Sequence, residues 1–336
     1  MNVVVGLVAA ALACSGCRTS SSVGASASEG ENRVAFLLST LQEERYKKDQ
    51  KYFEDTARSK GLAVFTLSAD NDNARQLSQV EDALARRAKV LVIQPTDSAA
   101  AAGYVAKAHA HGAKVVAYDR FVPGADFHVA HDSYGVGALQ AREAIKATHG
   151  RGNYVLLIGQ SGHSVASDFA RGYHETLQPY VDRGAITIVV EKFNDAWSPE
   201  QALKTVEDAI SKTKGNISAI LANNSGMARG AVQAVQAAGL GDHVFIAGAD
   251  ADAANVNYVC EGKQSIEVLK EIEPLATEAA TVAAEILQGK VVEAEAGASG
   301  VPTVWVPAVL ITKANVKAML IDSGFHSAAE LPSCQP

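Results

Sequence analysis

The chain is poor in cysteine and aromatic residues and has no long basic or apolar run, and each shortage excludes a class of protein. Of its 336 residues four are Cys, and the two beyond the first 17, Cys260 and Cys334, have no spacing typical of zinc ligands. Its net charge of -7 argues against nucleic acid as a partner, because such binding depends on neutralising phosphates. The apolar stretch 3–13 is far shorter than the roughly 20 residues of a membrane-spanning helix.

The first 32 residues are predicted to serve export and tethering. Residues 1–17 are similar to a signal peptide whose end, Cys14-Ser15-Gly16-Cys17, resembles a bacterial lipobox, although no basic residue precedes the apolar part. We therefore expect a periplasmic or cell-envelope protein whose only membrane attachment is a lipid on Cys17; cleavage nearby and a free periplasmic protein is the alternative. Residues 18–32 are rich in Ser, Ala and Gly, which is typical of a flexible tether.

Export also bears on the two remaining cysteines. An exported protein folds where disulfides form, so Cys260 and Cys334 are a candidate pair, and Cys334 would tie down the C-terminus. Two unpaired thiols are the alternative that the sequence leaves open.

From residue 33 onward, short apolar runs alternate with amphipathic stretches of helical period, which predicts parallel sheets covered by helices. The pattern starts afresh near residue 153, and 336 residues are many for a single core, so two similar α/β lobes are expected. The predicted strands are 33–38, 62–67, 89–94, 114–118, 127–130, 153–159, 186–191, 217–222, 244–249, 264–268 and 303–311. A helix is predicted between most neighbouring strands, and a last one over 313–322.

Polar side chains follow several of these strands directly. Asp119 and Arg120 follow one strand, Asn224 follows another, and Asp250 follows a third. In open parallel sheets the ligand crevice lies outside the carboxyl ends of the strands. Carboxylate, amide and guanidinium groups together both accept and donate hydrogen bonds, which suits a sugar or another polyol.

Motifs for catalysis are missing. Gly159-Gln-Ser161-Gly-His163 lacks the final glycine of a nucleophile elbow, and no GxGxxG or P-loop is present. Asp250 and Asp252 alone are a weak metal pattern. We therefore expect no catalytic residue, cofactor or metal, and a hydrolase or oxidoreductase is disfavoured.

Six segments of the sequence together form a specific pattern: 41–49, 89–95, 116–120, 195–200, 248–252 and 323–326. These segments resemble the ribose/galactose-type sugar-binding proteins of ABC transporters, in particular members that bind D-xylose. The resemblance implies a two-lobed Venus-flytrap fold, with doubly wound parallel sheets and a three-stranded hinge. It implies an N-terminal lobe of 33–135 and 273–304, and a C-terminal lobe of 136–272 and 305–336.

The resemblance also implies which residues hold the sugar. Polar contacts would come from Arg45, Asp119, Arg120, Asn224, Asp250 and Lys270, and Trp197, read as an exposed indole in a polar loop, would stack on the ring with Tyr46 and Phe169. Lys270 rests on the resemblance alone. The sequence differs from the family pattern at His163-Ser164-Val165, at Ala170 and at Ser225, which leaves the identity of the sugar open.

The sequence thus predicts a monomeric solute-binding protein that captures D-xylose or a close aldopyranose and delivers it to an ABC permease. A periplasmic sensor module for a kinase or receptor is the alternative. A sugar-responsive repressor core shares the fold but would need a DNA-binding headpiece, which residues 1–32 do not resemble.

Overall fold

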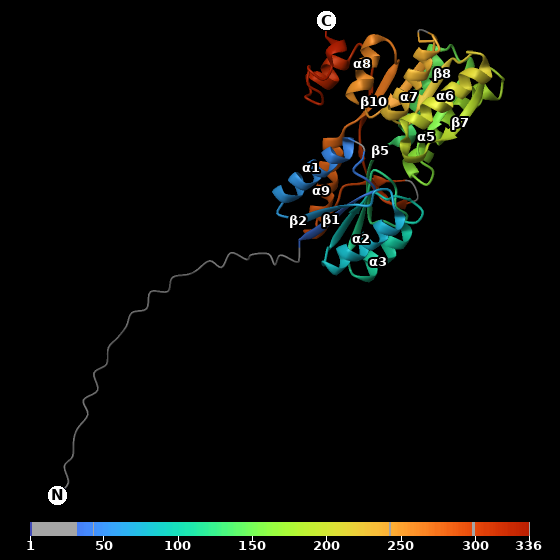
Figure 1. The fold of residues 1–336 in the computed structure, drawn as a ribbon. Helices are drawn as coiled ribbons and strands as arrows, with labels where there is room; N and C mark the ends of the chain where they lie inside the picture. Colours follow the sequence, from blue (N-terminus) through green and yellow to red (C-terminus); the bar gives the residue numbers. More distant parts are fainter. Residues whose placement is uncertain (2–31, 43, 242, 298–299, 336) are drawn as a thin grey trace.

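A computed structural model of the chain describes Met1 and residues 32–42, 44–241, 243–297 and 300–335. The predicted signal peptide, the lipidation site Cys17 and nearly all of the tether lie outside these residues and stay predictions. The rest forms two α/β lobes, each built around one sheet (Figure 1).

The first lobe contains a sheet in the order β11-β12-β5-β4-β3-β1-β2, parallel except for the β11–β12 pair. Its strands are β1 (Arg33–Leu38), β2 (Ala63–Ser68), β3 (Val90–Ile93), β4 (Lys114–Tyr118), β5 (Phe127–His131), β11 (Glu295–Ala296) and β12 (Pro302–Val306). Its helices are α1 (Glu44–Ser59), α2 (Asn73–Ala85), α3 (Ala102–Ala110) and α9 (Ile272–Leu287). The central strands are apolar throughout because helices cover both faces of the sheet.

The second lobe repeats this arrangement with the sheet order β13-β10-β9-β8-β6-β7, in which only β13 is antiparallel to its neighbour. Its strands are β6 (Gly152–Ile158), β7 (Ile186–Phe193), β8 (Ala219–Ala222), β9 (Phe245–Ala249), β10 (Ile266–Lys270) and β13 (Ala308–Ile311). Its helices are α4 (Ser133–Ala147), α5 (Ser164–Val181), α6 (Pro199–Thr213), α7 (Ser225–Ala237) and α8 (Ala253–Glu261). The prediction of two lobes with mostly parallel sheets is confirmed.

The chain crosses between the two sheets three times: between β5 and α4, between β10 and α9, and between β12 and β13. The single strand predicted over 303–311 is wrong. Pro307 divides it into β12, which pairs with β5, and β13, which pairs with β10 of the other sheet. The lobe boundaries given by the resemblance stay a proposal, with β12 in the first sheet as far as Val306.

Local signals place the helix ends. Ser198 caps α6 by accepting a hydrogen bond from the backbone N–H of Gln201, and Pro199 occupies the first turn. The helix predicted over 313–322 is instead a short π-helical turn at Lys317–Ile321.

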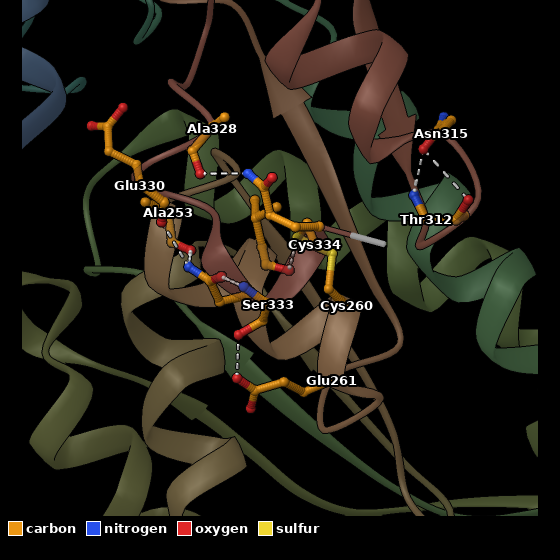
Figure 2. Close-up of a disulfide and its surroundings, with 12 residues drawn as sticks. Ala253, Cys260, Glu261, Thr312, Asn315, Ala328, Glu330, Ser333 and Cys334 are labelled. Atoms are coloured by element: carbon orange, nitrogen blue, oxygen red, sulfur yellow. Dashed lines mark hydrogen bonds between the residues drawn. A yellow bond between two sulfur atoms is a disulfide. The ribbon is translucent and has the colours of Figure 1, made fainter.

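The C-terminal segment is fastened to the second lobe. Cys260 of α8 and Cys334 form a disulfide, and the Ser333 hydroxyl donates a hydrogen bond to Glu261 at 2.6 Å (Figure 2). This segment packs beside α8 at the outer end of the lobe (Figure 1). Among the helices that the structure describes, none has the length and apolar character needed to cross a membrane.

Candidate functional site

A polar cavity of about 260 Å³ lies where the carboxyl ends of both sheets meet. Eight of the nine residues predicted to hold a sugar line it. The lining consists of Arg45, Tyr46, Asp119, Arg120, Val165, Trp197, Asn224, Asp250 and Lys270. All of these residues except Val165 carry a polar or aromatic side chain.

Arg45 is the cation that links the acidic groups of both lobes. It is the second residue of α1. Its guanidinium nitrogens lie 3.3 Å, 3.8 Å and 3.7 Å from carboxylate oxygens of Asp49, Asp119 and Asp250, respectively. Asp250 belongs to the second lobe and the other two to the first. Because Arg45 is 9% exposed, these charges interact with little screening by water.

Asp119 follows β4 in a left-handed backbone conformation, with φ of 59°. Its carboxylate accepts a hydrogen bond from the Gln94 side chain at 3.3 Å. Burial raises the pKa of Asp119, but the positive charges of Arg45, Lys270 and Arg120 lower it by more. The pKa of Asp119 therefore lies well below its usual value. The group is therefore a carboxylate at neutral pH and can accept hydrogen bonds from hydroxyl groups.

Asp250 and Lys270 form the opposite wall of the cavity. Asp250 follows β9 with φ of 96°, and Lys270 is the last residue of β10. The Lys270 Nζ lies 2.8 Å from Asp250 Oδ1, yet no well-directed hydrogen bond reaches that oxygen. Arg45 Nη2 likewise has no hydrogen-bond partner among the described residues. One buried donor and one buried acceptor, the latter paired with Lys270 by charge, thus face the cavity without a directed hydrogen bond, which a ligand can supply.

Arg120 is held mainly by its own lobe. Its guanidinium donates to the Pro95 carbonyl at 2.9 Å and to the Tyr46 hydroxyl at 3.1 Å, and it is 1% exposed. The residue therefore orders the first-lobe wall as well as facing the cavity. The two protein acceptors add a structural role to the predicted contact with the sugar.

His163, from the second lobe, contacts this wall. Burial and the nearby Arg120 lower the pKa of His163 to about 2, so the imidazole is neutral. Its Nδ1 accepts the indole N–H of Trp197 at 2.9 Å, which puts the ring proton on Nε2. With the proton on Nε2, the 3.2 Å approach of Arg120 to that nitrogen is a contact between two donors.

The expectation of an exposed Trp197 is wrong. The side chain is 8% exposed, because a left-handed turn at Ala196 and Trp197 folds the indole inward under Gly159. A Cβ on Gly159 would lie 2.4 Å from the ring, so only glycine leaves room for it. One edge of the indole still lines the cavity.

Two further predicted residues have additional roles. The side-chain Oδ1 of Asn224 accepts a hydrogen bond from the Met227 backbone N–H at 2.8 Å and so caps α7. The side-chain NH2 group takes no part in this cap and can donate to a ligand. Phe169 is fully buried and does not line the cavity; the Lys270 ammonium lies 5.6 Å from the centre of its ring. Phe169 therefore supports a residue that lines the cavity.

Sequence reasoning missed three residues that hold this site. Asp49, one helical turn after Arg45, is fully buried and also accepts a hydrogen bond from the Tyr118 hydroxyl. In the sequence, His163 belongs to an incomplete nucleophile motif and to a departure from the family pattern, and neither signal indicates that it holds the site. Glu267, in the middle of β10, had no signal beyond being an acidic residue in an apolar strand.

Glu267 fixes the loop that carries Asp250. Its carboxyl group contacts the backbone N–H of Ala251 at 3.1 Å, the hydroxyl of Ser225 at 2.9 Å and the amide of Gln264 at 2.6 Å. Burial raises the pKa of Glu267 to about 8, so the group is mostly protonated at neutral pH. A protonated oxygen donates to Ser225, whose own proton goes to the Ala249 carbonyl, and each proton then has an acceptor.

The two lobes touch around the cavity. The Ser98 N–H donates to the Gly162 carbonyl at 3.0 Å, and the Phe121 N–H donates to the Ser164 hydroxyl at 2.7 Å. These bonds join loops of opposite lobes, so the structure shows a closed arrangement. Among the described residues, no cluster of His, Cys, Asp and Glu is arranged to hold a metal ion.

The model of the periplasmic binding protein domain matches residues 34–291 of the chain. The D-xylose-binding periplasmic proteins of Haemophilus influenzae and Escherichia coli K12 are 35% and 36% identical to it, covering 90% of the chain and 92% and 93% of those proteins. The chain belongs to the periplasmic sugar-binding proteins of the ribose/galactose type. The predicted family is confirmed.

Other members differ in what they bind. A carbohydrate-transporter solute-binding protein of Chloroflexus aurantiacus, solved with D-glucose, superposes with a TM-score of 0.81 at 31% identity, covering 88% of this chain and 97% of that one. A multiple sugar-binding periplasmic receptor of Rhizobium radiobacter is 25% identical over 89% of this chain and 92% of that protein. The chain is thus a periplasmic sugar-binding protein of the ABC-transporter type.

Proposed function

We propose that this periplasmic sugar-binding protein captures D-xylose or a close aldopyranose between its lobes and delivers it unchanged to an ABC permease. The similarity to two D-xylose-binding proteins over most of the chain supports this choice of sugar. The sugar-contacting residues would be those that line the 260 Å³ cavity.

The single observation that carries the proposal is the pair of unsatisfied groups on opposite walls. Arg45 Nη2 from the first lobe needs an acceptor, and Asp250 Oδ1 from the second lobe lacks a directed donor. A sugar hydroxyl both donates and accepts, so a polyol can satisfy both groups at once. An uncharged ligand also suits the cluster, because three cations, Arg45, Arg120 and Lys270, face three carboxylates, Asp49, Asp119 and Asp250.

Stacking favours a sugar ring. The Trp197 and Tyr46 side chains line the cavity and offer apolar surface for the C–H face of a pyranose. The neutral His163, which holds Trp197, occupies the loop in which the sequence departs from the family pattern. A change of sugar preference relative to the D-xylose-binding relatives would therefore arise at this wall.

A thermal-shift panel of pentoses and hexoses tests the proposal, because a ligand that binds only the folded protein raises its melting temperature. D-xylose should give the largest shift, and the sugar recovered afterwards should be chemically unchanged. A larger shift with D-glucose would keep the class and replace the sugar, whereas no shift with any monosaccharide would overturn the proposal.

Sensing is the second candidate, and the similarity to a relative named as a receptor favours it. In that case the closed form would be recognised by a membrane receptor or kinase instead of a permease. Growth on the bound sugar after deletion of the gene separates the two: loss of uptake indicates transport, and unchanged uptake with lost sugar-induced expression indicates sensing. Lipid attachment through Cys17 and a monomeric state are part of the same proposal.

A further inference from the structure

A second cavity adjoins the proposed sugar cavity, and the two share Asp119 and Val165 as a common wall. It has a volume of about 200 Å³ and lies between the lobes, beside the crossings at β5–α4 and β12–β13. Its lining comprises Asp119, Phe121, His128, His131, Asp132, Ser133, Tyr134, Ser164, Val165, Ser167, Asp168, Arg171 and Trp305. An open groove continues it outward, with Asp132 and Trp305 lining both. The inner cavity, the second cavity and the groove therefore lie one after another toward the surface, with Asp119 and Val165 between the first two.

His131 gives this second cavity a buried, unused acceptor. The side chain is 2% exposed, and its Nδ1 donates to the Val306 carbonyl at 2.9 Å. Burial lowers the pKa of His131 to about 4, so the ring is neutral and Nε2 carries a lone pair. Nε2 has no hydrogen-bond partner among the described residues. A hydroxyl group in the cavity is the kind of donor that would satisfy it.

Trp305 gives the same cavity an aromatic surface. It is 38% exposed at the outer end, with its ring near that of His128 at 6.4 Å between centres. At the rim, the Arg171 guanidinium lies over the Tyr134 ring and pairs with Asp168 at 3.0 Å. An apolar ring surface beside polar donors and acceptors is the combination that a pyranose requires.

We propose that the second cavity is a subsite for the second ring of a disaccharide or glycoside whose first ring occupies the Arg45–Asp250 site. The inference rests on the proposed function, because it places the first ring in that site. The ring in the subsite contacts Trp305 with its C–H face and donates a hydroxyl to His131 Nε2. Asp119, which lines both cavities, accepts hydroxyls of the first ring next to the glycosidic bond.

The test is calorimetric titration of the whole protein with two matched pairs, D-xylose against xylobiose and D-glucose against cellobiose. One disaccharide should bind with one-to-one stoichiometry. Trp305→Ala should weaken the affinity for that disaccharide at least about fivefold, the scale of one aromatic contact. The affinity for the monosaccharide should stay unchanged. Trp305→Phe should restore most of the loss. Phe193→Ala removes an aromatic of similar exposure, 43%, on β7 outside the three cavities and should change neither affinity.

A second variant addresses the buried acceptor. His131→Asn keeps a donor for the Val306 carbonyl and removes Nε2, so it should weaken the disaccharide more than the monosaccharide. Binding of a monosaccharide with no binding of either disaccharide would overturn the subsite and leave the proposed function standing. Equal losses for both ligands in Trp305→Ala would also overturn it, since the cavity would then be only an access path. No binding of any monosaccharide would defeat the proposed function itself, and the subsite with it.

Discussion

Replacing Asp250 by Asn changes one of the two groups on opposite walls that lack a directed hydrogen bond. The substitution keeps the shape and one oxygen but removes the charge that lies 2.8 Å from Lys270 and 3.7 Å from Arg45. Hydrogen bonds to charged groups are worth about 1.5–3 kcal/mol, and about 1.4 kcal/mol corresponds to a tenfold change in Kd. Asp250→Asn should therefore weaken the affinity for the sugar by about tenfold to a hundredfold.

The same change should also lower the stability of the sugar-free protein. Lys270 is 4% exposed, and neutralising Asp250 removes its nearest countercharge and leaves the buried ammonium only the more distant Asp119. The double variant Asp250→Asn/Lys270→Met removes both charges and should recover part of this stability while binding stays weak. Urea unfolding without sugar and calorimetric titration with it measure the two effects separately.

Asp252→Asn is the matched control, because Asp252 lies two residues along the same loop and its side chain is 37% exposed. It should bind sugar like the wild-type protein. If Asp250→Asn also bound like the wild type, or if both variants lost affinity equally, the cavity would be the wrong place for the sugar.

Three further predictions concern the surroundings of the site. Between about pH 5 and 8 the unfolded chain has released the Glu267 proton that the folded protein keeps. The free energy of unfolding should therefore fall as the pH rises, by at most about 1.4 kcal/mol per pH unit. Urea titrations at several pH values measure this slope, and Glu267→Gln should flatten it. Trp197→Phe removes the indole N–H that donates to His163. It should weaken the affinity for the sugar about fivefold, which corresponds to about 1 kcal/mol for one neutral hydrogen bond. An unchanged affinity in calorimetric titrations would show that the indole serves packing alone. The double variant Cys260→Ser/Cys334→Ser removes the disulfide that joins residues 74 apart in the sequence. It should lower the stability by about 2–4 kcal/mol in thermal melts and leave the sugar affinity unchanged. Stability equal to that of the wild type would contradict a structural role of the disulfide.

The rule that ligands bind beyond the carboxyl ends of parallel strands brought Asp119, Arg120, Asn224 and Asp250 to one cavity from the sequence alone. It missed Lys270 because the apolar pattern suggested a strand that ends at residue 268, whereas β10 continues to Lys270. The resemblance to the family supplied that residue.

Other features depend on contacts that a local pattern does not contain. Asp49 lies in a run of charges that is typical of an exposed helix face, yet Arg45 and Tyr118 bury it. The polarity of the loop around Trp197 does not show that its left-handed turn folds the indole under Gly159. The continuous apolar run 303–311 hid the third crossing, for which Pro307 was the available signal, because proline interrupts a strand ladder.

Calorimetric titration of the wild-type protein with D-xylose, followed by chemical analysis of the recovered sugar, is the decisive test of sugar capture without catalysis. We expect saturable heat with one site per chain and a sugar that is recovered unchanged. Absence of heat with D-xylose and with every other aldopyranose tried, or recovery of an altered sugar, would contradict it.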